Sequence, residues 1–186
     1  MRISFSANFD AILYYGQEDK MPNFMRITIS IVRHGEKMEK TIDVMVIGTE
    51  PPCPRCDLLS LRVAEAAAHS SDMRLRHCSF DSSEATELGQ RLSRKVGTAR
   101  QVARDAGIQM DWDGVYGLIT RQKAQAKPDC RPADSWTPEL DRMLEPCQKA
   151  AESVGYLMTP VLVINGDVKH HGSVPSRQQI AEWLSE

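Results

Sequence analysis

The sequence predicts an α/β fold in which a strand–helix–strand unit precedes a β-hairpin and a final helix. A run of β-branched and apolar residues over 44–47, bounded by Gly48 and two prolines, is typical of a buried strand. The Leu- and Ala-rich segment over 58–68 favours a helix directly after it. Asn165-Gly166 between two strand-like runs predicts a hairpin, because a type I′ turn needs positive φ at both positions.

A Cys-x-x-Cys motif lies where the first predicted strand meets the helix. Pro54 suits the first helical position, because its missing N–H would have no helical partner. Cys53 is therefore expected at the N-cap, where free N–H groups and the helix dipole favour a thiolate. Arg55 adds positive charge beside it, and Cys56 lies one turn later, within reach of the same sulfur. A dithiol–disulfide couple needs this arrangement.

The motif is also compatible with half of a metal site. A structural zinc site needs a second closely spaced pair of ligands. The remaining cysteines are isolated and the histidine pair is adjacent: Cys78, Cys130, Cys147, His170 and His171. We therefore expect redox chemistry and no resident metal. A soft-metal or metalloid module that uses Cys53, Cys56 and Cys147 is the alternative function.

The C-terminal part carries a second signal. Thr159-Pro160 precedes an apolar run over 161–164, although proline donates no ladder hydrogen bond and belongs at the first residue of a strand. After the hairpin, Ser176 and Gln179 form a candidate capping box. The helix that they open has an apolar face made by Ile180, Trp183 and Leu184.

In this order, the strand, Cys-x-x-Cys helix, strand, Thr-Pro, hairpin and terminal helix resemble the thioredoxin fold, over about 41–80 and 147–186. The run from Thr159 to Ser176 is similar to compact redox-active disulfide proteins, and the layout resembles a thioredoxin-like (seleno)protein family. The resemblance implies that Pro160 is cis and lies beside the motif, and that Thr159 offers its backbone N–H and C=O to a substrate chain.

The resemblance also implies a thiol–disulfide oxidoreductase. Cys53 would form a mixed disulfide with a protein or small molecule that carries a thiol or disulfide, and Cys56 would resolve it. A reductase would return the Cys53–Cys56 disulfide to the dithiol. No organic cofactor is expected, because the electrons travel through sulfur.

Three departures separate the sequence from a typical thioredoxin. Pro52 precedes the motif where thioredoxins have tryptophan, and the inner pair is Pro54-Arg55. Ile47 stands where thioredoxins bury an aspartate, so the usual proton acceptor for Cys56 is missing. Because Arg55 should stabilise the thiolate and with it the reduced form, we expect a more oxidising couple than that of thioredoxin.

More chain than a minimal thioredoxin needs lies between the second strand, expected over 73–80, and the Thr-Pro step. We expect a helical insertion at about 82–146 that covers the site, as in the DsbA-type oxidoreductases. One long helix is predicted over 85–106, from apolar residues at spacings of three and four, with its end at Gly107. Further helices are expected over 115–124 and from Thr137, with a kink or restart at Pro146.

Two further cysteines are candidate accessory thiols, which either pair, relay electrons from the motif or do nothing. Cys130 lies in a polar loop and is expected to be exposed. Cys147 follows Pro146, where a helix start would lower its pKa. Cys78 on the second strand is expected to be a small buried hydrophobe.

The chain of 186 residues is long enough for one sizeable core. We assign the domain to 41–186 and regard 1–40 as an N-terminal extension, with Met38 as an alternative start. A net charge of −2 without a basic stripe argues against nucleic acid, and no apolar run is long enough for a membrane span. Without a secretory signal pattern we expect a cytoplasmic protein, in which a Cys-x-x-Cys is more often catalytic than structural.

Overall fold

The computed structural model describes residues 41–68, 72–126 and 129–186, so the predicted N-terminal extension and Met38 lie outside it. The elements in chain order are β1 (Ile42–Gly48), α1 (Pro54–Ala66), β2 (Met73–Ser79), α2 (Ser83–Arg91), β3 (Lys95–Gly97), α3 (Ala99–Ala106), α4 (Trp112–Gln125), the 3₁₀ helix η1 (Pro132–Ser135), α5 (Pro138–Ala151), β4 (Tyr156–Met158), β5 (Val161–Ile164), β6 (Asp167–His171) and α6 (Arg177–Leu184). None of these helices is both long and apolar enough to cross a bilayer.

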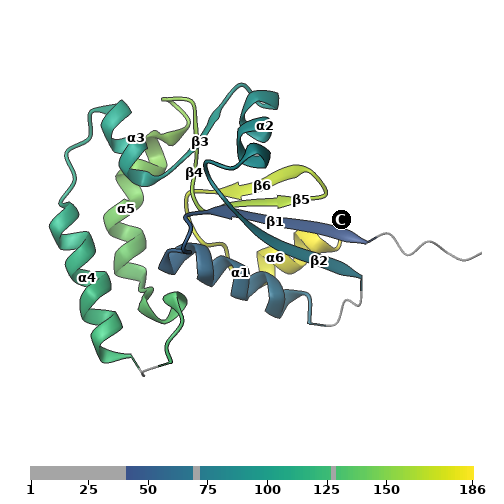
Figure 1. Ribbon diagram of the computed structural model, residues 1–186, viewed down its shortest axis with the longest axis horizontal. Coiled ribbons are helices and arrows are strands. Elements are labelled where there is room, and N and C mark those ends of the chain that lie inside the picture. The colour runs from purple at the N-terminus through teal and green to yellow at the C-terminus, as the bar shows by residue number, and fades with distance from the viewer. Residues whose placement is uncertain (1–40, 69–71, 127–128) are drawn as a thin grey trace, which may run out of the picture. The chain divides into compact units, whose positions relative to one another are not determined.

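The central sheet has the strand order β2-β1-β5-β6 (Figure 1). Strand β1 is parallel to β2 and antiparallel to β5, and β5 and β6 form an antiparallel hairpin. The hairpin turns at Asn165 and Gly166, whose φ angles are 51° and 87°. The predicted strand–helix–strand unit and the hairpin are both confirmed, and the chain has the predicted mixed α/β fold, in an arrangement consistent with the thioredoxin fold.

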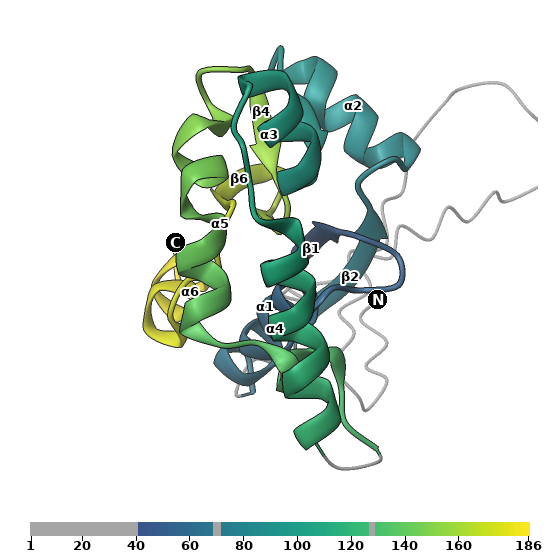
Figure 2. The ribbon, with the colours of Figure 1, turned by 90° about the vertical axis from the view of Figure 1, so that its left-hand side faces the viewer.

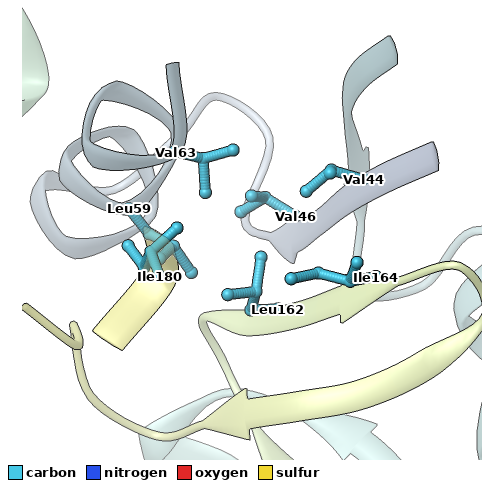
Figure 3. Close-up of a cluster of buried hydrophobic side chains, with 7 residues drawn as sticks. All are labelled: Val44, Val46, Leu59, Val63, Leu162, Ile164 and Ile180. Carbon is cyan, nitrogen blue, oxygen red and sulfur yellow. The ribbon is translucent and has the colours of Figure 1, made fainter. Parts of the chain in front are cut away.

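Helices cover both faces of this sheet. On one face, α1 and α6 pack against β1 and β5 through seven buried side chains (Figure 3): Val44, Val46, Leu59, Val63, Leu162, Ile164 and Ile180. On the other face, Ala85 and Leu88 of α2 pack against Met45 and Ile47 of β1. Alternate residues of β1 therefore enter opposite clusters, which fixes the orientation of the strand that leads into the motif.

The single long helix predicted over 85–106 is wrong. Helix α2 ends at Arg91, the chain reverses at Ser93 with φ 54°, and Val96 lies in β3, which pairs in parallel with β4. Gly89 permits this reversal, because its carbonyl accepts a bond from the Arg94 N–H and a Cβ there would lie 2.6 Å from the Arg94 oxygen. Helices occupy most of the segment at about 82–146, but β3 interrupts them.

Helices α3, α4 and α5 pack on one another beyond the end of the sheet, where Figure 2 shows α4 and α5 side by side. Helix α3 ends as predicted at Gly107, which has φ 66°. Helix α4 begins at Trp112 rather than 115, because Asp111 caps it. Helix α5 begins after Thr137 as predicted but runs through Pro146 without a restart.

Candidate active site

The Cys-x-x-Cys motif lies at the start of α1. Cys53 is the N-cap residue in an extended conformation, and Pro54 occupies the first turn, as the sequence predicts. The Cys56 N–H donates to the Cys53 Sγ at 3.3 Å, and the two sulfurs are 2.7 Å apart. Both cysteines are free thiols; Cys53 is half-buried and Cys56 is fully buried. One sulfur is thus presented at the helix end and the other lies behind it.

The pKa values of the two thiols are shifted in opposite directions. The hydrogen bond from the Cys56 side chain is the main cause that lowers the pKa of Cys53, to about 6, against the opposing effect of burial. The Cys56 N–H and the Arg55 charge lower it further. The pKa of Cys56 is raised well above its usual value, by its hydrogen bond to Cys53, by burial and by the Cys53 charge. Cys53 is therefore the thiolate of the pair at neutral pH, and Cys56 keeps its proton.

Arg55 points away from the sulfurs into the protein. Its Nε lies 2.7 Å from the Asp141 Oδ1, an ion pair rather than an aligned hydrogen bond, and its Nη2 donates to the Gly172 carbonyl. The Arg55 charge ranks behind the Cys56 hydrogen bonds among the causes that lower the Cys53 pKa. Arg55 also joins the motif to α5 and to the loop after β6.

Asp57, directly after the motif, forms a second connection that the sequence analysis missed. Its carboxylate lies 2.7 Å from the Arg131 Nη2 and accepts from the Ala133 N–H at 2.9 Å. Burial raises the pKa of Asp57, but the Arg131 and Ala133 hydrogen bonds outweigh it and leave the pKa below its usual range. An ionised Asp57 therefore ties α1 to η1. A carboxylate in the first turn of α1 was the only local signal for it.

The Thr159–Pro160 peptide bond is cis, as the resemblance implies. Both residues are buried, and the Pro160 carbonyl accepts from the Gly172 N–H at 3.0 Å. The Thr159 N–H donates to the Gly97 carbonyl at 2.8 Å, so β3 already uses this donor. The expectation that the Thr159 N–H is free for a substrate chain does not hold in this structure.

The accessory cysteines differ from their predicted settings. Cys147 is fully buried in the middle of α5, and burial raises its pKa, so the predicted lowering by a helix start is wrong. Cys130 is half-buried rather than exposed. Cys78 packs against the α2 side of the sheet but is only half-buried.

In the described part of the chain, no three His, Cys, Asp or Glu side chains are placed to hold a metal ion together.

His77 on β2 is a further residue that the sequence analysis did not single out. Its Nε2 lies 3.1 Å from the Thr49 carbonyl oxygen, in the loop between β1 and the motif. A Cβ built at Gly48 would meet both the His77 ring and the Cys56 side chain. The absence of a side chain at Gly48 thus allows the imidazole to approach the buried sulfur.

Comparisons with known proteins find similarity to thioredoxin-like proteins. Residues 139–185 match the family model described as a thioredoxin domain. No curated protein matches the chain. The crystal structure of a thioredoxin-like oxidoreductase from Silicibacter pomeroyi DSS-3 is 15% identical and aligns with 77% of this chain and 84% of that one, at a TM-score of 0.32. The matched residues hold the cis-proline, the hairpin and the helix that packs beside α1, so the C-terminal part of the chain is similar to a thioredoxin domain.

Proposed function

We propose that the protein is a thiol–disulfide oxidoreductase that cycles between a Cys53–Cys56 dithiol and disulfide. The observation that carries the proposal is the pair of sulfurs 2.7 Å apart at the start of α1, with the pKa of one lowered to about 6 and that of the other raised. A nucleophile that is ionised at neutral pH and a protonated thiol behind it are what the two steps of disulfide exchange require.

In the reducing direction, the Cys53 thiolate attacks a substrate disulfide and forms a mixed disulfide, and one substrate thiolate leaves. The Cys56 sulfur then attacks Cys53, which forms the Cys53–Cys56 disulfide and releases the second substrate thiolate. Two electrons pass from the two cysteines to the substrate, and no organic cofactor takes part. The oxidising direction runs the same steps backwards.

The partners proposed are a protein or small molecule with an accessible disulfide and a reductase that restores the dithiol, acting in the cytoplasm, where thiols are kept reduced. The family resemblance puts the substrate chain beside Thr159 and Pro160. Since the Thr159 N–H bonds to Gly97, pairing with that donor would require β3 to release it.

The test is a glutathione redox titration of metal-free protein, in which mass spectrometry counts free thiols. We expect one two-electron transition that is lost in Cys53→Ser, with a potential above the roughly −270 mV of thioredoxin because the reduced form holds a stabilised thiolate. A potential at or below that value would contradict the oxidising character. Failure to form an intramolecular disulfide, together with metal retained through purification, would favour the metal-binding alternative.

A further inference from the structure

We propose that His77 is the proton acceptor for Cys56 in the step that resolves the mixed disulfide, an inference that rests on the proposed exchange function. Cys56 must lose its proton before its sulfur can attack. Ile47 stands where thioredoxins carry a carboxylate for this purpose, and it packs against α2 in the apolar cluster on the other side of the sheet. The structure brings an imidazole to Cys56 from a different strand.

The approach of His77 to Cys56 depends on Gly48. A Cβ at residue 48 would lie 2.6 Å from the Cys56 Sγ and 2.9 Å from the His77 Cε1, both closer than atoms tolerate. The sulfur and the ring carbon can therefore be no more than about 5.5 Å apart, the two distances laid end to end, which is within the reach of one bridging water. Gly48 at the end of β1 thus lets His77 of β2 approach Cys56 in α1.

The hydrogen bonding of the His77 ring leaves Nδ1 free to accept a proton. The Thr49 carbonyl is only an acceptor, so the His77 Nε2 that lies 3.1 Å from it carries the hydrogen. Nδ1 then holds a lone pair. It is buried and has no hydrogen-bond partner among the described residues. A buried acceptor without a partner is rare in proteins and is a common feature of reactive sites.

Two carboxylates close to the motif, Asp57 and Asp141, are already paired. Asp57 is bound by Arg131 and Ala133. Asp141 is held by Arg55 and accepts a hydrogen bond from the Trp136 indole. Both carboxylates are therefore engaged by cationic partners, and a carboxylate so engaged is a poor base. Imidazole has a basicity suited to proton transfer near neutral pH.

The resolving step moves one proton and exchanges one disulfide bond for another. With Cys53 bound to the substrate sulfur, the Cys56 thiol transfers its proton to the His77 Nδ1, directly or through one water. The resulting Cys56 thiolate attacks the Cys53 Sγ, the Cys53–Cys56 bond forms, and the bond to the substrate breaks. The substrate sulfur leaves with the electron pair of that bond as a thiolate and takes its proton from the imidazolium or from solvent, which regenerates neutral His77.

His77→Gln is the sharpest variant, because its amide nitrogen can still donate to Thr49 while the basic Nδ1 is removed. Reduced protein is mixed with oxidised glutathione, quenched in acid and analysed by intact mass. The glutathione adduct should form on Cys53 at the wild-type rate. Its decay to the intramolecular disulfide should slow by about 10²-fold at neutral pH, a usual contribution of a general base. The deficit should shrink as pH rises, because hydroxide then removes the Cys56 proton.

His77→Asn serves as a second variant, with the same expectation, in case the first fails to fold. His170 is a half-buried histidine on β6, and His170→Gln is the matched control. This variant should form the Cys53–Cys56 disulfide at the wild-type rate. Wild-type decay of the adduct in either His77 variant would overturn the proposal for His77 alone. If the wild-type protein forms no glutathione adduct, or never forms the Cys53–Cys56 disulfide, the exchange function is refuted and the His77 role with it.

Discussion

The Arg55 Nε lies 2.7 Å from the Asp141 Oδ1, so a residue between the two motif cysteines forms an ion pair with a residue of α5, in the segment between the second strand and the cis-proline. The Arg55 side chain is only 4% exposed and that of Asp141 24%. Asp141 also accepts from the Trp136 Nε1 at 3.0 Å. The ion pair therefore joins the Cys-x-x-Cys motif to α5.

Asp141→Ala should destabilise the protein by about 3 kcal/mol, because removal of one partner leaves the buried Arg55 charge uncompensated. The measurement is the free energy of unfolding in urea. The control is Arg177→Ala, which breaks the exposed Arg177–Glu65 pair and should cost less than about 1 kcal/mol. Equal losses in the two variants would show that the Arg55–Asp141 pair contributes no more than a surface pair.

Asp141→Asn and Arg55→Met should move the Cys53 pKa in opposite directions. The first variant leaves the Arg55 charge without its counter-ion, which should lower the pKa further below about 6. The second removes a cation that favours the thiolate, which should raise it. Thiolate absorbance against pH measures both. Shifts of the same sign would contradict the electrostatic explanation.

The reduced protein should become more stable as pH rises from 6 towards 9. Over this window the folded Cys53 is ionised while the unfolded thiol, with its ordinary pKa of 9.0, still binds a proton. Stability should then rise by at most about 1.4 kcal/mol per pH unit, and this contribution is lost as pH falls through the folded pKa. Denaturant unfolding of reduced wild type and Cys53→Ser at several pH values measures it. The same slope in both proteins would be inconsistent with the assignment to Cys53.

Gly48→Ala should destabilise the protein by about 1–3 kcal/mol, because the new methyl group meets Cys56 and His77 at contact distances that require the chain to shift. Gly117→Ala is the matched control. There the nearest atom is the end of the Arg121 side chain at 3.5 Å, and alanine favours a helix over glycine, so stability should rise by about 0.5–1 kcal/mol. Thermal or urea unfolding distinguishes the two, and a tolerated Gly48→Ala would argue against the close approach.

The elements that the sequence predicts correctly begin, turn or end at residues whose own backbone preferences fix the conformation. Pro54 opens α1, Asn165 and Gly166 turn the hairpin, and Gly107 ends α3, each through the conformation of its own backbone. The three-residue strand β3 was missed because apolar residues at helical spacing continue across it. The spacing does not reveal that Val96 packs towards the sheet while Val102 packs against α5 and β4.

The cysteine pair of the site was also predictable from spacing, but its surroundings were not. Asp141 lies far from Arg55 in the sequence, and Arg131 and Ala133 also lie far from Asp57. Each contact forms only because α5 and η1 return to the start of α1. The position of His77 depends on the β1–β2 register, which pairs it with Val46 and sets it beside the end of β1.

The residues between and after the two cysteines face inward. Arg55 bonds to Asp141 and Gly172, and Asp57 to Arg131 and Ala133. An exchange of the Pro54-Arg55 dipeptide for that of a known oxidoreductase would therefore change two properties of this protein at once. The reduction potential of the cysteine pair would shift, and α1 would lose its ion pair with α5. Such a graft therefore calls for a neutral residue at position 141, because Asp141 would be left without its partner.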